Sequence, residues 1–195
     1  MVDQRTKGLH FRLRARAMVI AERSNPKSRV AFVSTDICFG TQSIRLDVVP
    51  KLQQKYGDLY TLDNVVVSAT HTHSGPGGYS WYAVYDMTTF GFDSQNHRAI
   101  ADGVYQAIVR AHENMSSGGR IFMNAGRLLY SNINRSPTSY LQNPPEERKI
   151  YAEDGDTDKT IVVLRIEDDN GKELGSVSWF AVHCTSMNNT NMLIS

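Results

Sequence analysis

The sequence predicts an α/β fold, a mixed sheet with flanking helices, and three observations support this class. Apolar runs of strand length alternate along the chain with segments of helical periodicity. Of the 195 residues, 41% are hydrophobic and 21% are charged, a composition typical of globular proteins. The sequence contains neither internal repeats nor low-complexity tracts. The simplest organisation is therefore one domain with a sizeable core, or an incomplete portion of a larger domain.

The strands expected in the first half of the chain share an apolar, often β-branched composition and are bounded by turn residues: 15–21, 29–37 and 65–69. Between the last two strands, Thr41 can cap a helix with apolar positions at helical spacing. These positions are Ile44, Val48 and Leu52. Pro50 lies inside this pattern, so we expect it to kink or restart the helix.

In the second half of the chain, the sequence pattern predicts one long helix and three further extended segments. The helix is expected over 94–114, because its apolar positions form a single stripe. After Gly118-Gly119 the chain should extend over 120–124. Later strands are expected over 160–167 and 175–183. Asn170-Gly171 lies between them and is a strong hairpin-turn signal.

The tripeptide His71-Thr72-His73 is the clearest candidate for a functional site. It directly follows the strand expected over 65–69, and the carboxyl ends of strands are where open α/β sheets usually place their sites. On an extended segment, imidazoles at i and i+2 point to the same side, and neutral imidazole is a common zinc ligand. The glycine-rich segment 74–78 would let the backbone approach a bound ion or substrate. The alternative is a pair of surface histidines in a turn.

A catalytic zinc ion typically takes three protein ligands and a water molecule, so other donors are required. His183 would lie at the end of the strand expected over 175–183, much as His71 follows an earlier strand. Further residues with suitable donor atoms are His73, His10, Asp36 and Glu22, and the sequence does not choose among them. We assign no role to His97 and His112, because histidines on a helix are more often surface or core-edge residues than ligands.

Arg135 lies in a loop between Asn134 and Ser136-Pro137. Its planar guanidinium could clamp a carboxylate or polarise a carbonyl group. The alternative is an exposed arginine in a turn. Ser136 is a weak candidate nucleophile, because no Gly-x-Ser-x-Gly motif surrounds it.

Charge and cysteine content narrow the function classes. The net charge is +1, and the alternating Arg12, Arg14 and Arg16 are typical of a solvated strand edge, so nothing indicates a nucleic-acid partner. No apolar stretch reaches the roughly 18 to 20 residues of a membrane span. Cys38 and Cys184 are the only cysteines, and we expect buried free thiols rather than a disulfide.

Several separated motifs, in a fixed order, extend over nearly the whole chain. The strongest is the segment 68–78, Ser-Ala-Thr-His-Thr-His-Ser-Gly-Pro-Gly-Gly. The others are Phe32-Val33-Ser34-Thr35-Asp36, Asn134-Arg135-Ser136-Pro137, Trp179-Phe180-Ala181-Val182-His183 and Ser186-Met187-Asn188. In these residues and their order the chain resembles the neutral ceramidase family of neutral or alkaline, non-lysosomal enzymes.

The resemblance implies a zinc-dependent amidase that hydrolyses the N-acyl bond of ceramide to sphingosine and a fatty acid. His71 and His183 match the family's two histidine zinc ligands. His73 matches the second histidine of the motif, near the metal, and Arg135 matches an arginine needed for activity. Zn²⁺ would lower the pKa of a bound water toward about 7 and polarise the amide carbonyl. His73 could then pass a proton to the leaving amine.

The resemblance also implies that residues 1–195 are the N-terminal part of a ceramidase catalytic domain. In similar proteins a glutamate ligand, a tyrosine ligand, the active-site serine and a C-terminal immunoglobulin-like domain lie beyond the segment that this chain matches. We therefore expect the chain to be inactive alone and to bind metal weakly. The alternative is a non-catalytic, truncated paralogue that binds lipid or a full-length partner. A third reading is an amidase for another N-acyl amide.

The resemblance favours an extracellular or membrane-associated location, with ceramide reached at a membrane surface. Three glycosylation sequons, which begin at Asn114, Asn134 and Asn188, are compatible with this location. No secretory signal peptide is visible near Met1. The sequence leaves the oligomeric state open.

Overall fold

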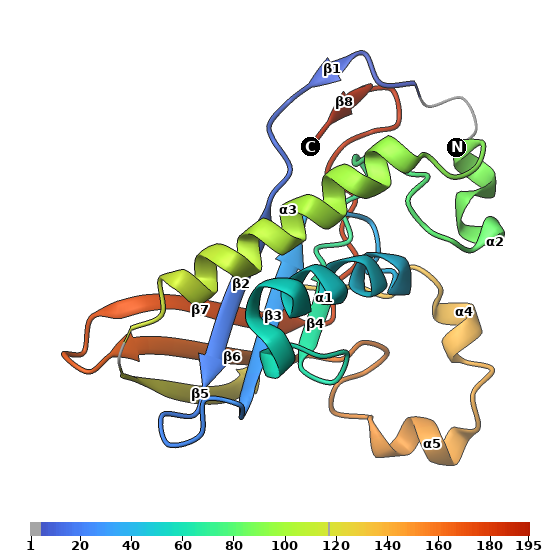
Figure 1. The fold of residues 1–195 in the computed structure, drawn as a ribbon. Helices are drawn as coiled ribbons and strands as arrows, with labels where there is room; N and C mark the ends of the chain where they lie inside the picture. The colour runs from blue at the N-terminus through green and yellow to red at the C-terminus, as the bar shows by residue number, and fades with distance from the viewer. Residues whose placement is uncertain (1–4, 117) are drawn as a thin grey trace. The chain divides into compact units, whose positions relative to one another are not determined.

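A computed structural model describes residues 5–116 and 118–195 (Figure 1). The chain divides into two compact units, which are described separately. Unit 1 contains residues 1–115 and 184–195, and unit 2 contains residues 116–183. Together they form an α/β structure with three small sheets, which confirms the predicted fold class.

Unit 1 is built on a mixed sheet with the strand order β2-β3-β4. The strands are β2 (Ala15–Ala21), β3 (Arg29–Thr35) and β4 (Val65–Ala69). β2 and β3 are antiparallel, with Ala15 opposite Thr35, whereas β4 runs parallel to β3, with Ala69 opposite Thr35. All three predicted strands are confirmed, although β3 ends two residues before the expected position.

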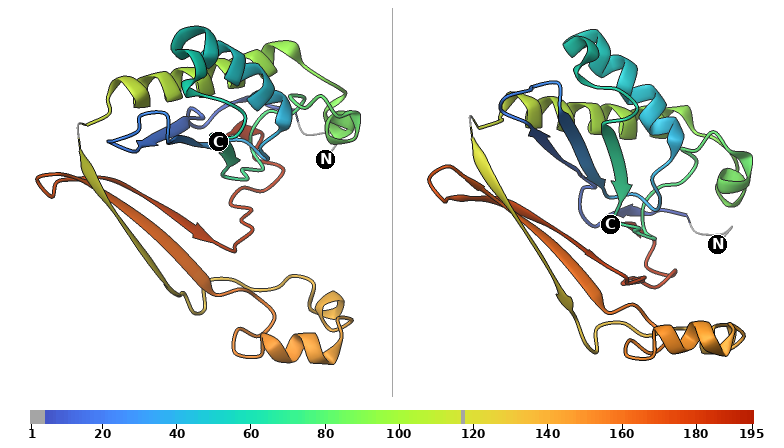
Figure 2. Two further views of the ribbon diagram at one scale, coloured as in Figure 1. Left: turned by 60° about the horizontal axis from the view of Figure 1, so that its bottom comes forward. Right: turned by 90° about the horizontal axis from the view of Figure 1, so that it is seen from below.

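Two helices cover one face of this sheet, α1 (Gln42–Tyr56) and α3 (Ser94–Glu113) (Figure 2). In β3 the buried side chains alternate, as expected for a strand with one face against helices. The core joins sheet and helices through Ala31, Val33, Ile44, Val48, Val49, Leu52, Tyr60, Val65, Ala101, Val104, Ile108 and Val109. The three predicted apolar positions of α1 are therefore core positions, and α3 contributes four core residues.

α1 begins after Thr41, as the sequence predicted, but it is not interrupted at Pro50. The Thr41 hydroxyl accepts a hydrogen bond from the Ser43 N–H at 3.1 Å, which satisfies one of the unpaired donors of the first turn. The helix then runs through Pro50 to Tyr56 as one element, so the expected restart does not occur. Pro50 is exposed, so its ring lies on the solvent side of the helix and the core contacts on the other side continue past it.

The remaining elements of unit 1 are short. They are β1 (Gly8–Leu9), η1 (Gly57–Leu59), α2 (Ala83–Asp86), η2 (Met87–Thr89) and β8 (Leu193–Ile194). β1 and β8 pair in parallel, with Gly8 opposite Leu193 and Leu9 opposite Ile194. Gly78 has φ +78°, and a Cβ at this position would lie 2.8 Å from the carbonyl oxygen of Gly91. This glycine is therefore required for close packing against the segment after η2.

α3 carries both histidines to which we assigned no role, and each lies in a core-edge environment. His97 is buried, packs against Trp81 and Phe92, and its Nδ1 lies 3.0 Å from the Tyr79 carbonyl oxygen. His112 stacks on Tyr56 with ring centroids 4.1 Å apart.

Two donors converge on Nδ1 of His112, the Tyr60 hydroxyl at 2.7 Å and the Arg29 guanidinium at 3.2 Å. Because an arginine N–H can only donate, Nδ1 carries a lone pair and the proton of the neutral ring is on Nε2. Burial, followed by the charge of Arg29, lowers the pKa of His112.

The lowered pKa of His112 predicts that unit 1 loses stability on acidification. The unfolded chain binds this proton near pH 6.5 and the folded chain only at lower pH, so stability falls as the pH drops from about 6.5 through the folded pKa. Urea unfolding at pH 7.5 and pH 5.5 measures this change. In the His112→Gln variant, which does not titrate here, we expect a smaller loss between the two pH values. An equal loss in both proteins would contradict the prediction.

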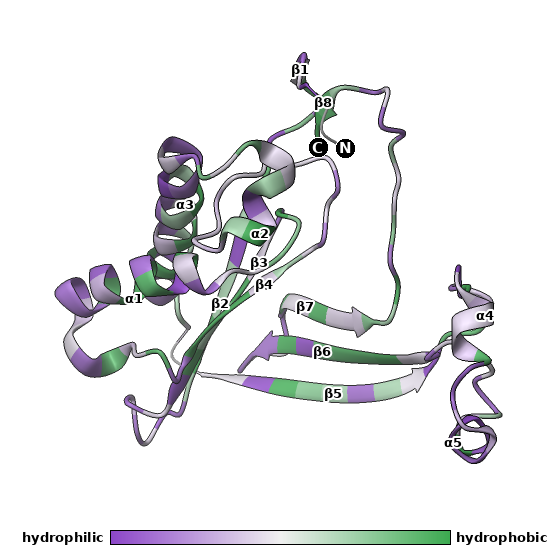
Figure 3. Ribbon diagram, turned by 90° about the vertical axis from the view of Figure 1, so that its right-hand side faces the viewer, coloured by the Kyte–Doolittle hydropathy of each residue, from purple (hydrophilic) through white to green (hydrophobic). Residues whose placement is uncertain are grey.

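Unit 2 contains an antiparallel sheet in the order β5-β6-β7. The strands are β5 (Gly119–Arg127), β6 (Thr160–Asp168) and β7 (Glu173–Phe180). The predicted hairpin turn is confirmed, since Gly171 has φ +81° and the Asp168 N–H donates to the Lys172 carbonyl oxygen at 2.9 Å. Hydrophobic residues make up much of β6 (Figure 3).

β7 ends at Phe180, three residues before the predicted end at His183. Its last residue, Phe180, pairs with Ile161, so only Thr160 of β6 lies beyond the end of the ladder. The Val182 N–H also donates to the Phe180 carbonyl oxygen at 2.9 Å, which turns the chain out of the strand. His183 therefore lies in an irregular segment and not at a strand terminus.

Between β5 and β6, unit 2 carries the two short helices α4 (Pro137–Tyr140) and α5 (Pro145–Ile150). Ser136 is the N-cap residue of α4. In the part of the chain that the structure describes, no helix has the length and apolar character needed to cross a lipid bilayer.

Candidate metal centre

A pocket in unit 1 surrounds the predicted metal motif. It has a volume of about 490 Å³ and is formed where β3 and β4 end and where the C-terminal segment 184–195 returns to the sheet. The lining residues are His10, Phe11, Arg16, Asp36, Thr70, His71, Thr72, His73, Ser74, Cys184, Ser186, Met187 and Ser195. The C-terminal segment is held there because Thr72 Oγ1 donates to the Ser195 carbonyl oxygen at 2.6 Å.

His71 and His73 are neighbours in this pocket, but the backbone between them is not extended as we predicted. His71 has φ +62°, a left-handed conformation that is uncommon for residues other than glycine. The two rings nevertheless lie edge to face with centroids 4.7 Å apart. Such strained backbone conformations cost about 1–3 kcal/mol and often occur at functional sites.

The orientation of His71 suits metal binding. Its Nδ1 lies 2.5 Å from the Cys38 carbonyl oxygen. A carbonyl oxygen can only accept, so Nδ1 carries the proton and Nε2 of the neutral ring carries the lone pair. Histidine ligands commonly donate their second ring nitrogen to a backbone carbonyl in this way, which fixes the tautomer and the ring orientation.

The donor atoms around His71 form a set that fits a zinc ion. Ligand atoms of Cys38, His71 and His73 all lie within 4.8 Å of one another. Cys38 Sγ lies 3.9 Å from His71 Nδ1. Imidazole nitrogen and thiolate sulfur are the donors that Zn²⁺ prefers. Burial raises the pKa of the Cys38 thiol, which favours the protonated form of this group in the metal-free protein.

The other donor candidates in unit 1 have different environments. Asp36 lines the pocket, but one carboxylate oxygen accepts from Arg16 Nη1 at 2.8 Å and the other from the Arg14 N–H at 2.9 Å. The hydrogen bond from Arg16 to Asp36 raises the pKa of Arg16. His10 also lines the pocket, with Nδ1 3.4 Å from Ser195 Oγ. Arg16 is therefore part of the pocket wall and not only a solvated strand residue.

Glu22 does not belong to this site. It follows β2 and pairs with Ser28 at the end of the sheet where β3 begins, whereas His71 follows β4 at the end where β3 finishes. A seven-residue strand separates these ends by about 20 Å. Glu22 is therefore too far from His71 to bind the same metal ion, and the prediction of Glu22 as a possible ligand is wrong.

His183 and Arg135, the other predicted site residues, belong to unit 2. Arg135 is exposed and follows Asn134, whose side-chain oxygen accepts from the Ser136 N–H at 2.7 Å. The pairing of His71 with His183 as zinc ligands stays a prediction. Both cysteines are free thiols, as predicted, but Cys184 is exposed and Cys38 is only partly buried, so the expected burial is wrong.

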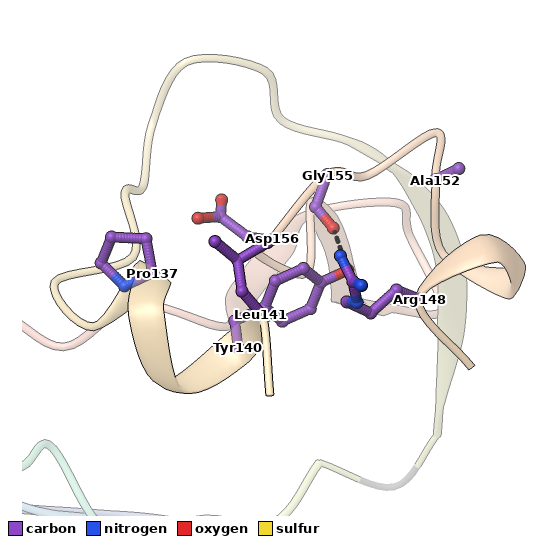
Figure 4. Close-up of a pocket in the computed structure, with 7 residues that line it drawn as sticks. All are labelled: Pro137, Tyr140, Leu141, Arg148, Ala152, Gly155 and Asp156. Atoms are coloured by element: carbon purple, nitrogen blue, oxygen red, sulfur yellow. Dashed lines mark hydrogen bonds between the residues drawn. The ribbon is translucent and has the colours of Figure 1, made fainter. Parts of the chain in front are cut away.

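A second pocket, in unit 2, has a volume of about 410 Å³ and is shown in Figure 4. It lies among α4, α5 and the segment that leads to β6, and Tyr140 closes one side by donating from its hydroxyl to the Gly155 carbonyl oxygen at 2.9 Å. Arg148 and Asp156 are the charged residues of its lining. No residue predicted as a ligand lines it.

Sequence reasoning missed Cys38 as a donor beside the histidines. The residue lies 33 positions before His71, and the only available signal was its place just after a predicted strand. Because β3 and β4 are adjacent and parallel, their carboxyl ends bring both segments to one edge. Parallel pairing, once known, would have placed Cys38 and His71 together.

The fold and the pocket define an α/β protein with a candidate metal site at the carboxyl ends of neighbouring strands. A sequence model described as neutral/alkaline non-lysosomal ceramidase, N-terminal, matches residues 1–195. The chain therefore belongs to the neutral ceramidase family.

Named relatives and solved structures agree with this assignment. The chain is 48% identical over 196 residues to neutral ceramidase A of Dictyostelium discoideum, covering 100% of this chain and 27% of the relative. It is 45% identical over 194 residues to neutral ceramidase 1 of Arabidopsis thaliana, covering 100% of this chain and 24% of the relative. The crystal structure of neutral ceramidase from Pseudomonas aeruginosa superposes with a TM-score of 0.91 and 43% identity, covering 100% of this chain and 30% of that chain. The chain thus spans about a quarter of the length of these curated relatives.

Proposed function

We propose that this chain contributes the metal-binding N-terminal part of a zinc-dependent ceramidase, which hydrolyses the N-acyl amide bond of ceramide to sphingosine and a fatty acid. The observation that carries the proposal is the His71 geometry. A backbone carbonyl fixes its tautomer, and the Cys38 thiol and the His73 imidazole lie beside it. Membership of the neutral ceramidase family supports the substrate.

Four residues have roles in the proposed reaction. His71 and His183 would hold the ion, and Cys184, the next residue after His183 in the chain, lines the pocket of His71. When bound, Zn²⁺ would act as a Lewis acid and lower the pKa of a coordinated water. His73, whose ring contacts that of His71, would move a proton toward the leaving amine. The planar guanidinium of Arg135 would donate hydrogen bonds to the acyl oxygen.

The experiment compares two proteins. One is the 195-residue chain, and the other is a chimera in which this chain replaces the matching 27% of Dictyostelium discoideum neutral ceramidase A. Ceramide hydrolysis is measured with added zinc and after treatment with a chelator. We expect zinc-dependent hydrolysis by the chimera. We expect none by the 195-residue chain, since the family resemblance places further ligands and a serine in the remaining part. An active chimera that is insensitive to complete zinc removal would overturn the metal role.

A further inference from the structure

Asn132 lies at the centre of a hydrogen-bonded cluster in unit 2 that no part of the proposed reaction uses directly. Its Nδ2 donates to two backbone carbonyl oxygens, that of Asp158 at 2.7 Å and that of Ala181 at 2.8 Å. Its Oδ1 accepts from Lys159 Nζ at 2.7 Å. Lys159 Nζ also donates to the Asn132 backbone carbonyl at 3.3 Å and to Thr157 Oγ1.

The chemistry of these partners leaves one orientation for the Asn132 amide. Backbone carbonyl groups only accept and an ammonium group only donates, so the nitrogen must face the two carbonyls and the oxygen must face Lys159. Both N–H donors and one acceptor lone pair are thereby used. A residue of other chemistry at this position cannot make the same three contacts.

The cluster joins three stretches of chain that are far apart in sequence. Asn132 lies three residues before Arg135, Asp158 and Lys159 lead into β6, and Ala181 lies two residues before His183. The contact to Ala181 falls where β7 has ended, so ladder hydrogen bonds no longer hold this segment. The Asn132 side chain therefore supplies a hydrogen bond that ties the Arg135 loop to the segment carrying His183.

We propose that Asn132 is a positioning residue for the ceramidase reaction, because its bridging amide fixes the Arg135 loop and the His183 segment relative to each other within unit 2. This inference rests on the proposed function for the roles of Arg135 and His183. The physical basis is pre-organisation, since a misplacement of about 1 Å at reacting groups can cost about 10²-fold in rate.

The test substitution is Asn132→Asp, which keeps the shape and the acceptor for Lys159 but loses both N–H donors. The resulting carboxylate would face two carbonyl oxygens, so the Ala181 segment should move away. Asn170→Asp, the same chemical change in the β6–β7 turn of unit 2, is the matched control. If Asn132→Asp does not fold, Asn132→Ser, which keeps one donor and adds no charge, replaces it.

Two readouts separate positioning from the proposed function. In the 195-residue chain, backbone amide NMR shifts at 134–135 and 181–183 should change with Asn132→Asp and not with Asn170→Asp. In the chimera, Asn132→Asp should lower kcat about 10²-fold with little change in KM, while Asn170→Asp leaves both unchanged. Shift changes confined to the neighbours of Asn132 overturn the inference, as does a kcat equal to that of the control. An inactive parent chimera would count against the proposed function alone, because the NMR comparison still decides whether Asn132 joins the two segments.

Discussion

Replacement of His71 by alanine is expected to reduce zinc affinity by at least about 10²-fold and kcat/KM in the chimera by on the order of 10³-fold. Removal of an outer-shell partner already costs about 10–100-fold in metal affinity, so loss of a ligand should cost more. Metal catalysis contributes several kcal/mol of transition-state stabilisation, and each 1.36 kcal/mol corresponds to a factor of ten. Zinc content after dialysis and steady-state hydrolysis of ceramide measure the two effects.

His10→Ala provides the matched control for His71→Ala. His10 lines the same pocket and is exposed, but it lies outside the group of donor atoms formed by Cys38, His71 and His73. We therefore expect zinc affinity close to that of the parent protein. Equal loss of zinc in the His10 and His71 variants would show that the ligand set has been assigned incorrectly.

Secondary structure followed from local patterns wherever these patterns were strong. β2 and β4 have the predicted limits, and α3 begins at Ser94, where the Asp93 side chain caps it by accepting from the Asn96 N–H. The errors occur where tertiary pairing decides the outcome. β7 stops at Phe180, where only Thr160 of β6 is left as a partner, although the sequence after Phe180 is still apolar. Strand length depends on the partner strand, which a local pattern does not contain.

The candidate site was also predictable only where a local pattern contains its residues. His71 and His73 lie two positions apart in the sequence, so one motif was enough to identify both. Cys38, Arg16 and the C-terminal segment reach the pocket through sheet register and through contacts such as Thr72 with Ser195. These contacts join residues more than 30 positions apart. Composition and periodicity do not reveal how β3 and β4 are paired.

Leu52→Ala is expected to destabilise unit 1 by about 2–5 kcal/mol, the usual cost of removing a large aliphatic side chain from a packed core. Leu52 lies on α1, is 0% exposed and packs among core residues from the sheet and from α3. The chain has two tryptophans, Trp81 in unit 1 and Trp179 in unit 2. In a Trp179→Phe background, Trp81 fluorescence during urea unfolding therefore reports on unit 1 alone.

The control for this core substitution is Leu62→Ala, which removes the same atoms from a side chain that is 42% exposed. Surface substitutions usually change stability by no more than about 0.5 kcal/mol, so the two variants should differ several-fold in their effect. A small effect at Leu52 would mean that α1 is not held by the core described for unit 1. Because α1 follows the Cys38 segment directly, loosening this helix should also weaken the proposed zinc binding near His71. Zinc titration of the Leu52 variant at low temperature, where it remains folded, tests that link between core packing and the site.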